Sequence, residues 1–382
     1  MRLLIAGGGT GGHIYPALAV ARSLQTIEPA ARLSWLGGHR GLEAQVVPEA
    51  GIPLRRLLLR SLRTVDVNIH VLLDPIRLAL SIPQAFCLLL FRRPAAIFTT
   101  GGYVAIPVLI AAAILRIPAV MWDGNVVPGR SVRFTARFCR CLAVSFPETS
   151  GRLRAATPCF VTGTPIRDPR SVDREEARRA LGLSDKDRLV LIFGGSQAVR
   201  RFNLAVAEAL PRLVARTRVI HVAGDAGYEA AVAARNALPA ELRERYRPER
   251  FLGSEMASVL AAADLVVGRA GSSTLAEMAA FGLPMVVVPY PHAAGHQRRN
   301  AEQMVGAGAA MLVEDAAFDA EALISAAAIL ERPAERKRMA QAARSLAKPA
   351  AADAVAALVM ACAHRRPLPS ENEIEALARG QA

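Results

Sequence analysis

The feature of this sequence that most constrains its fold is a strand, a glycine-rich turn and a helix that occur twice. An apolar segment, Arg2–Ala6, leads into Gly7-Gly-Gly-Thr-Gly-Gly-His13, and a second, Arg188–Phe193, leads into Gly194-Gly-Ser-Gln197. A segment with helical spacing of apolar residues follows the first turn, and a helix is expected after the second. The repeat predicts an α/β protein with two Rossmann-like, doubly wound halves.

Apolar and β-branched runs predict the other strands. They are Arg32–Leu36, Ala95–Thr100, Pro118–Trp122, Cys141–Ser145, Cys159–Val161, Asp264–Val267 and Met285–Val288. Strands that alternate with helices form parallel sheets, and a chain of 382 residues suits two domains. We expect an N-terminal domain over residues 1–165, a C-terminal domain over residues 166–345, and a helix with a charged tail over residues 346–382 that can return to the N-terminal domain.

The composition limits the partners that the chain can bind. A net charge of +14 calls for an anionic partner, which can be a nucleic acid, an anionic lipid or a phosphorylated substrate. Aromatic residues make up only 5% of the chain, which argues against a surface that stacks nucleic-acid bases. The five cysteines have neither zinc-site nor disulfide-framework spacing, so we expect buried thiols in a reducing cytosol. The first strand begins at Arg2, which leaves no room for a signal peptide.

The segment Gly268–Met304 has the clearest pattern of an anion site. Its Gly-Ser-Ser-Thr sequence follows a buried strand and precedes a helix predicted to begin near Ser273. A helix start leaves N–H groups without partners and has partial positive charge, and small residues let an anion approach closely. A second polar loop, Tyr290–Gln297, follows the next strand. Loops after parallel strands are where ligands bind in open α/β sheets.

Glu277 lies one turn into this predicted helix and has two interpretations. With Thr274 it forms the pattern Thr-x-x-Glu of a capping box, which only starts a helix. Alternatively, its carboxylate accepts hydrogen bonds from a ribose diol while the helix start holds phosphate. The spacing alone favours the capping box, and both interpretations can hold together.

His13 lies at the end of the first glycine-rich turn. The pattern Gly7-x-Gly9-x-x-Gly12 formally matches the dinucleotide fingerprint, but the second strand ends in Gly37-Gly38, where that fold needs an acidic residue. The glycine-rich turn therefore predicts only that the backbone passes close to a ligand, without indicating which ligand. A helix N-terminus disfavours protonation, so His13 can accept a proton there. A histidine that merely caps or packs is an equal alternative.

The segment Leu54–Phe91 is apolar and is bordered by arginines. These are Arg55, Arg56, Arg60, Arg63, Arg77, Arg92 and Arg93. Asp74, Pro75 and Pro83 interrupt the run, so we expect no transmembrane helix. Apolar surface bordered by arginine suits a helix that lies on an anionic membrane. A buried helix with a solvated basic face is the alternative.

Six segments, taken in order, resemble the MurG family of bacterial glycosyltransferases. They are GGGTGGHIYPALAVA (7–21), GGYVAIPVLIAA (101–112), TGTPIR (162–167), GGSQAVRRFN (194–203), RAGSSTLAEMAAFGLP (269–284) and HQRRNAEQM (296–304). The resemblance covers roughly residues 1–362. It implies the GT-B fold, with two Rossmann-like domains facing across a cleft. The implied reaction is an inverting transfer of N-acetylglucosamine from UDP-N-acetylglucosamine to the 4-hydroxyl of undecaprenyl-pyrophosphoryl-N-acetylmuramoyl-pentapeptide, the step from lipid I to lipid II in peptidoglycan synthesis.

The resemblance also implies a set of donor-binding residues. They are Thr10, Gly11, Gly12, Asn125, Arg167, Ser196, Leu252, Ser272, Ser273, Thr274, Leu275, Ala276, Glu277 and Gln297. Within the set, Glu277 contacts the ribose, Leu252 the uracil and Gln297 the hydroxyls of the sugar. The helix start and Arg167 stabilise the leaving pyrophosphate, so neither a metal nor a cofactor is implied.

The acceptor side is less firmly predicted, because the chain departs from the family there. Where members commonly have His-Glu-Gln-Asn, this chain has Trp122-Asp-Gly-Asn125, so an imidazole and an amide are missing. The resemblance implies that Tyr103 faces the acceptor and that His13 or Asp123 is the general base. We favour His13, because a carboxylate exposed at the mouth of a cleft is a weak base near neutral pH.

The resemblance implies a peripheral protein on the cytoplasmic side of the cell membrane. Its partners are the sugar nucleotide, the undecaprenyl-linked acceptor and the anionic membrane surface, and nucleic acid is not among them. Three alternatives are a GT-B enzyme for another lipid such as diacylglycerol, a dinucleotide-dependent oxidoreductase and an inactive membrane-attached sugar-nucleotide binder. The missing acidic residue after the second strand disfavours the oxidoreductase.

Overall fold

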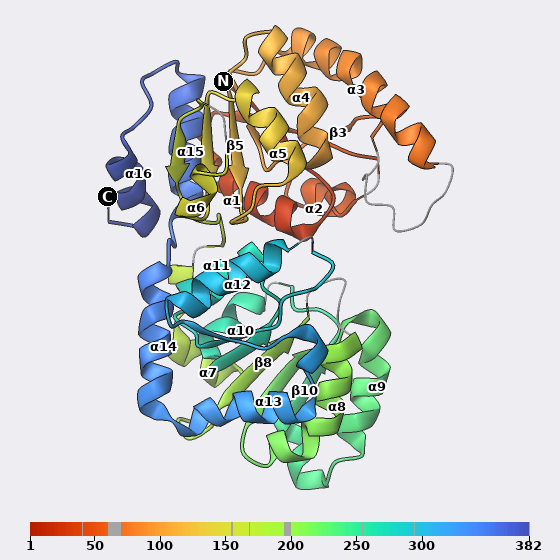
Figure 1. Cartoon of the computed structure of the whole chain (residues 1–382), viewed down its shortest axis with the longest axis vertical. Helices are drawn as coiled ribbons and strands as arrows, with labels where there is room; N and C mark the ends of the chain where they lie inside the picture. The colour runs from red at the N-terminus through yellow and green to blue at the C-terminus, as the bar shows by residue number, and fades with distance from the viewer. Residues whose placement is uncertain are drawn as a thin grey trace. The chain divides into compact units, whose positions relative to one another are not determined.

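The computed structural model describes residues 1–39, 41–59, 70–153, 156–167, 169–194, 200–253, 255–293 and 295–381. They form two compact units, shown in Figure 1. Unit 1 comprises Met1–Ile166 and Lys348–Ala382, and unit 2 comprises Arg167–Ala347. Each unit is built on one parallel sheet with helices packed against it. The predicted doubly wound α/β architecture is therefore confirmed.

The sheet of unit 1 has seven strands in the order β3-β2-β1-β4-β5-β6-β7. Their bounds are β1 Arg2–Ala6, β2 Arg32–Gly37, β3 Leu54–Arg56, β4 Ala96–Thr99, β5 Ala119–Asp123, β6 Cys141–Val144 and β7 Cys159–Val161. Leu3 of β1 lies opposite Leu33 on one side and Ala96 on the other. The strand order reverses between β1 and β4, and ligands bind at such a point in open α/β sheets, beyond the carboxyl ends of the strands.

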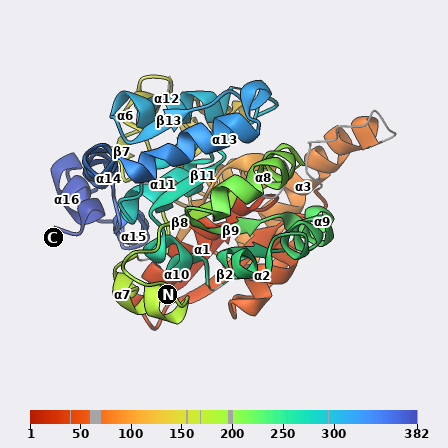
Figure 2. The same cartoon turned by 90° about the horizontal axis from the view of Figure 1, so that it is seen from below.

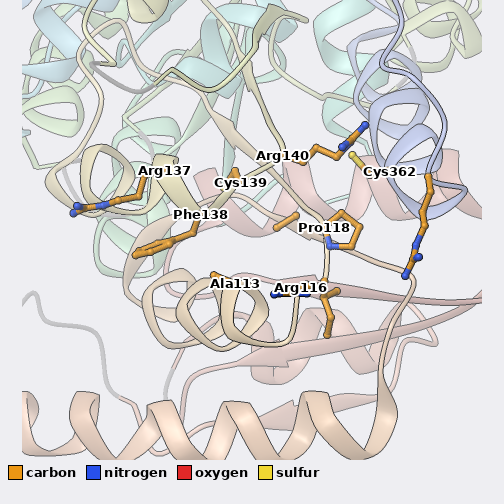
Figure 3. Close-up of a pocket in the computed structure, with 11 residues that line it drawn as sticks. Ala113, Arg116, Pro118, Arg137, Phe138, Cys139, Arg140 and Cys362 are labelled. Carbon is orange, nitrogen blue, oxygen red and sulfur yellow. The ribbon is translucent and has the colours of Figure 1, made fainter.

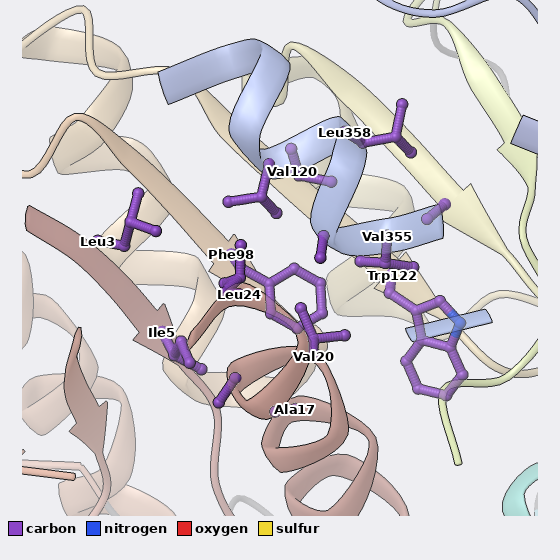
Figure 4. Packing of buried hydrophobic residues seen from close by; sticks show 14 of the residues in the cluster. Leu3, Ile5, Ala17, Val20, Leu24, Phe98, Val120, Trp122, Val355 and Leu358 are labelled. Carbon is purple, nitrogen blue, oxygen red and sulfur yellow. The ribbon is translucent and has the colours of Figure 1, made fainter. Parts of the chain in front are cut away.

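Helices cover both faces of this sheet. They are α1 Gly11–Ile27, α2 Glu43–Glu49, α3 His70–Arg92, α4 Gly102–Ile114, α5 Arg130–Thr135, η1 Ala136–Phe138, α6 Pro147–Ser150, α15 Ala351–Ala363 and α16 Glu371–Arg379. On one face, Phe98 and Trp122 pack with Val20 of α1 and Val355 of α15 (Figure 4). Alternate strand residues, such as Leu4 and Ile97, pack with α3 and α4 on the other face.

Unit 2 has a six-stranded sheet in the order β10-β9-β8-β11-β12-β13. The strands are β8 Leu189–Phe193, β9 Arg218–Val222, β10 Tyr246–Glu249, β11 Leu265–Gly268, β12 Met285–Val287 and β13 Ala310–Leu312. The helices are η2 Pro169–Ser171, α7 Arg174–Ala180, α8 Arg200–Val214, α9 Gly224–Asn236, η3 Ala240–Arg245, α10 Met256–Ala262, α11 Ser272–Ala280, α12 His296–Gly306, η4 Asp315–Ala317, α13 Ala320–Ala327, η5 Ala328–Glu331 and α14 Pro333–Leu346. Helices α8 and α13 lie side by side (Figure 2) and share a core with Val190 and Val267.

Helix α3 contains the prolines that interrupt the apolar run of the sequence. It runs from His70 to Arg92 without a break, although Pro75 and Pro83 lie within it. Both prolines are on its exposed side, and helix α4 packs along the opposite side. Two segments, Leu73–Arg92 and Pro333–Ala363, are long and apolar enough to cross a membrane by length and composition alone. The second segment contains two helices, α14 and α15, and 56% of its apolar window is buried.

Candidate functional site

The turn between β1 and α1 is held firmly by the second strand. The Gly7 N–H donates to the Leu36 carbonyl (3.1 Å), and the Trp35 indole donates to the Gly7 carbonyl (2.8 Å). Gly9 has a φ of 102°, a conformation that glycine adopts at no steric cost. Thr10 is the N-cap of α1, so Gly11 and Gly12 are its first two residues. Their amides come at a helix start, where an anion is favoured.

Glu43, the first residue of α2, supports this turn from behind. Its side chain is fully buried, and its two carboxylate oxygens accept the N–H groups of Gly9 (2.9 Å) and Gly38 (3.0 Å). A Cβ atom on Gly8 or Gly41 would collide with this carboxylate. Sequence reasoning missed Glu43, because no local pattern distinguishes a buried glutamate from an exposed one at a helix start.

Replacing Glu43 with alanine should lower the free energy of unfolding by about 2–4 kcal/mol. The buried N–H of Gly38 loses its acceptor at about 1–3 kcal/mol, and the partly buried N–H of Gly9 adds about 1 kcal/mol. Denaturant unfolding followed by circular dichroism measures the change. Glu49→Ala, at an exposed position of the same helix, is the control and should change the free energy by less than about 0.5 kcal/mol. Equal losses in the two variants would contradict the anchoring role of Glu43.

Tyr103, predicted to face the acceptor, lies against the same turn. Its ring is next to Gly9 and Gly38, and its hydroxyl is buried without a hydrogen-bond partner among the described residues. Burial raises the pKa of Tyr103, and the negative charge of Glu43 raises it further. The ring therefore supports the glycine-rich turn in this structure.

His13 is the third residue of α1. Its Nδ1 atom lies 2.8 Å from the Thr100 carbonyl oxygen, which follows β4. Because a carbonyl oxygen only accepts hydrogen bonds, Nδ1 must carry the proton in this contact. In the neutral ring the lone pair then belongs to Nε2, which is the nitrogen able to accept a proton. The contact thus selects the tautomer that a general base needs.

Asp123 ends β5 and is buried, so the expectation of an exposed carboxylate is wrong. Its Oδ1 atom accepts the backbone N–H of Asn125 (3.0 Å) and lies 3.4 Å from the Asn125 side-chain nitrogen. Burial raises the pKa of Asp123 to about 6, against the opposing effect of backbone N–H groups of Asn125, Gly129 and Gly124. A carboxylate with this pKa is a better base than an exposed one.

Trp122, which replaces a histidine common in the family, lies in the core. Its indole N–H donates to the Gly163 carbonyl (2.9 Å), and its ring packs near Val355 of α15 (Figure 4). Successive residues of a strand point to opposite faces, so Trp122 and Asp123 have different surroundings. The departure from the family at position 122 is therefore a change of core packing.

In unit 2, helix α11 begins at Ser272 with Gly271 as its N-cap. Glu277 is then the sixth helical residue, too far along for a capping box, and that interpretation is wrong. Burial raises the pKa of Glu277 to about 7, and the nearby positive charge of Arg167 opposes this. The Arg167 guanidinium also donates to the carbonyl of Gly253 (3.3 Å), the residue after Leu252. Arg167, Gly253 and Glu277 thus lie together.

The first turn of α11 holds three more of the predicted donor residues, Ser272, Ser273 and Thr274. Leu275 follows them and is buried, and Ala276 is partly buried. The hydroxyl of Ser273 is buried without a hydrogen-bond partner in the described part of the chain. Ser196, the remaining predicted residue of this unit, lies outside the described residues.

The ends of β11 and β12 are tied together by residues that sequence reasoning left without a role. Arg269 donates to the Val288 carbonyl (3.1 Å) and pairs with Asp315 (2.5 Å). The buried Asn300 donates to the Ala270 carbonyl (3.3 Å). These contacts hold the loop before α11. In the sequence, the only signal for Arg269 and Asn300 is that they lie within the segments 269–284 and 296–304.

Gln297 is the predicted contact to the sugar. Its side-chain carbonyl oxygen accepts the Tyr290 N–H (2.9 Å), which leaves its NH₂ group to donate to a ligand. Among the residues that the structure describes, no three His, Cys, Asp or Glu side chains form a group that could hold a metal ion.

The chain matches two family models and many relatives. Residues 3–144 match the glycosyltransferase family 28 N-terminal domain, and residues 189–357 match the glycosyltransferase family 28 C-terminal domain. The UDP-N-acetylglucosamine--N-acetylmuramyl-(pentapeptide) pyrophosphoryl-undecaprenol N-acetylglucosamine transferase of Moorella thermoacetica is 38% identical over 369 residues, which is 94% of this chain and 98% of the relative. The protein of the same description from Desulforudis audaxviator is 36% identical over 364 residues, with coverage of 93% and 96%.

The crystal structure of Acinetobacter baumannii MurG is similar as well. Its TM-score is 0.74 at 28% identity, and the match covers 94% of this chain and 99% of that one. Both family 28 domain models match in order along the chain, and each falls mainly on one of the two Rossmann-like sheets. The chain therefore belongs to glycosyltransferase family 28, among the MurG N-acetylglucosaminyltransferases with the GT-B fold.

Proposed function

We propose that this chain transfers N-acetylglucosamine from UDP-N-acetylglucosamine to the 4-hydroxyl of undecaprenyl-pyrophosphoryl-N-acetylmuramoyl-pentapeptide, with inversion at the anomeric carbon. The observation that supports this most is that Arg167 lies near Glu277, which belongs to the second turn of α11 and follows the Ser272–Thr274 start of that helix. A cation and a helix start suit a diphosphate, and a carboxylate suits a ribose diol. Unit 2 is thus assigned to the donor, and unit 1 to the acceptor and the membrane.

On the donor side, each group has a chemical task. The amides of Ser272–Thr274 and the Arg167 guanidinium stabilise the negative charge that develops on the leaving UDP. Glu277 accepts hydrogen bonds from the ribose hydroxyls. Gln297 donates its side-chain N–H to a hydroxyl of the sugar, because its carbonyl oxygen is already held by Tyr290.

On the acceptor side, the proton of the 4-hydroxyl needs a base. His13 Nε2 takes that proton while the acceptor oxygen attacks the anomeric carbon and the bond to UDP breaks. The amides of Gly11 and Gly12 face phosphate. Asp123 holds Asn125 towards the donor sugar, and it is the second candidate for the base because of its raised pKa.

Turnover of UDP-N-acetylglucosamine by the purified chain tests this function. The undecaprenyl-linked acceptor should be glycosylated, and diacylglycerol in the same detergent should not. If UDP is released with diacylglycerol and not with the undecaprenyl-linked acceptor, the proposed acceptor is wrong and the chain glycosylates another lipid. Tight binding of NADH, measured by fluorescence, would favour the oxidoreductase instead.

The chain is further proposed to attach to an anionic membrane through α3. This helix has an exposed apolar stripe at helical spacing, formed by Ile76, Leu80, Pro83, Cys87, Leu90 and Phe91. Phe91 is 82% exposed and Ile76 is 56% exposed. Arg55, Arg56, Arg92 and Arg93 are exposed too, whereas Arg60 and Arg63 lie outside the described residues. An apolar stripe near basic residues is the pattern of a helix that lies in a membrane interface.

Phe91→Ser should weaken binding to vesicles of phosphatidylglycerol and phosphatidylcholine by roughly tenfold, because one large apolar side chain no longer enters the interface. Co-sedimentation with the vesicles measures the change. Ile27→Ser, at an exposed apolar position of α1, is the control and should bind as the parent does. Binding should also fall with added salt, since surface charges are screened within a Debye length. Parent protein that sediments with neither anionic nor neutral vesicles would rule out the attachment.

A further inference from the structure

Figure 3 shows a basic pocket in unit 1. It lies at the end of the sheet opposite the glycine-rich turns. Strands β5 and β6 begin here, and helices η1, α4 and α15 end here. The cavity has a volume of about 620 Å³. Because the strands are parallel, their amino ends form one edge of the sheet and the proposed reaction site is at the other. The pocket is therefore separate from the groups assigned to the reaction.

Four arginines line this pocket, namely Arg116, Arg137, Arg140 and Arg365. None of them forms an ion pair with a carboxylate in the described part of the chain, where many other arginines do. Arg137 donates to the Phe134 carbonyl (3.0 Å) and lies over the rings of Phe134 and Phe138. Arg140 donates to the Arg366 carbonyl (3.4 Å). A hydrogen bond with Cys141 lowers the pKa of the Cys362 thiol, and the charge of Arg140 lowers it further. Four like charges around one hollow repel each other and favour an anion within it.

The backbone at two of these arginines is unusual. Arg116 (φ 52°) and Arg365 (φ 55°) are the only non-glycine residues with positive φ in the part of the chain that the structure describes. Each follows the C-cap of its helix, α4 or α15. The backbone N–H of the arginine and that of the next residue donate to carbonyl groups in the last turn of the helix, as in a Schellman motif. Glycine is the usual residue at this place.

Other helices of this chain have glycine at the position after the C-cap. Gly182 after α7, Gly282 after α11 and Gly308 after α12 occupy the corresponding position, each with positive φ. An arginine in the left-handed region has a conformational cost that glycine does not have. Arg116 and Arg365, which stand at this position in place of glycine, both line the same pocket. This indicates that the pocket requires their side chains.

The pocket adjoins the apolar stripe of α3. Arg93, just after α3, donates to the carbonyl of Leu115, the residue before Arg116 (3.3 Å). Phe91 is at the same end of α3, and Ile114, the last residue of α4, is 62% exposed. Exposed apolar side chains thus lie beside a pocket for an anion, as a lipid with a charged headgroup requires.

We propose that this pocket binds the phosphate of an anionic phospholipid headgroup. The proposal rests on the proposed attachment of α3 to the membrane. Guanidinium groups bind phosphate oxygens through paired hydrogen bonds, so four of them around one cavity can hold a headgroup in a fixed place. The pocket then adds a specific headgroup contact to the nonspecific contact that the apolar stripe makes.

The double variant Arg116→Gly/Arg365→Gly tests the proposal without harming the fold. Both glycines relieve the positive φ, so the melting temperature should stay the same or rise. Binding to phosphatidylglycerol vesicles should weaken by roughly 25-fold, about fivefold for each arginine near an anionic surface. The control is Arg22→Gln/Arg152→Gln, which removes the same charge from exposed positions of unit 1 away from the pocket.

The outcomes separate this proposal from membrane attachment itself. A loss in the pocket variant no greater than in the control overturns the headgroup site and leaves the attachment standing. Parent protein that binds no vesicles overturns both. Inorganic pyrophosphate is added in calorimetry without lipid. If its binding depends on Arg116 and Arg365 while vesicle binding does not, the ligand is a soluble phosphate and the lipid assignment is wrong.

Discussion

Turnover by the His13→Ala variant is expected to fall by about 10²–10⁴-fold, with UDP affinity little changed. The contact between Nδ1 and the Thr100 carbonyl leaves Nε2 as the nitrogen that accepts a proton, and alanine removes it. General-base catalysis typically contributes this factor, and it acts in the transition state, so kcat falls while ground-state binding of the donor stays. Steady-state kinetics and calorimetry with UDP measure the two quantities.

Asp123→Asn is the matched variant, because it removes only the charge of the second candidate. Asparagine keeps the oxygen that accepts the Asn125 N–H, so a purely positioning Asp123 tolerates the change. If Asp123 is the base, this variant is the more damaging one, and kcat/KM of the parent falls as the pH drops below about 6, the raised pKa of Asp123. That result, together with a mild His13→Ala variant, would reverse the assignment.

The sequence predicted best the parts of the fold that a local pattern determines. Strands such as β1, β8 and β11 are buried on both faces, so they appear as continuous apolar runs. Edge strand β10, Tyr-Arg-Pro-Glu, was missed because half-buried polar residues form it. Pro75 and Pro83 interrupt the apolar run in the sequence, but helix α3 continues through both, because they lie on its exposed side while α4 packs along the opposite side.

The candidate site was predictable only where a motif implied it. The helix start at Ser272 came from the order of strand, small residues and apolar spacing. Glu43 behind the glycine-rich turn, and the burial of Asp123, depend on contacts between residues far apart in the chain. A charged residue looks the same in a sequence whether buried or exposed, so Asp123 was expected to be exposed and is not. The roles of His13, Asp123 and Glu277 in catalysis and binding remain predictions.

Glu277→Ala is expected to weaken UDP binding by about 10²-fold. Two ribose hydroxyls lose a charged acceptor at about 1.5 kcal/mol each, and about 3 kcal/mol corresponds to that factor. Calorimetry measures the affinity, and circular dichroism checks that the fold is intact. Glu241→Ala, at an exposed position of the same unit, is the control and should bind UDP as the parent does. Unchanged affinity in both variants would leave Glu277 without a ligand role.

The raised pKa of Glu277 adds a pH dependence with a definite sign. Both ribose hydroxyls donate to the carboxylate only when it is ionised, and its pKa of about 7 leaves it mainly protonated at pH 6. Ligand binding therefore releases a proton, so the affinity rises with pH up to about 7 and levels off above it. Uridine, which has no phosphate to titrate, is the suitable probe. Glu277→Gln keeps an uncharged acceptor and should show weaker binding that does not vary with pH, whereas a parallel rise in this variant would assign the titration to another group.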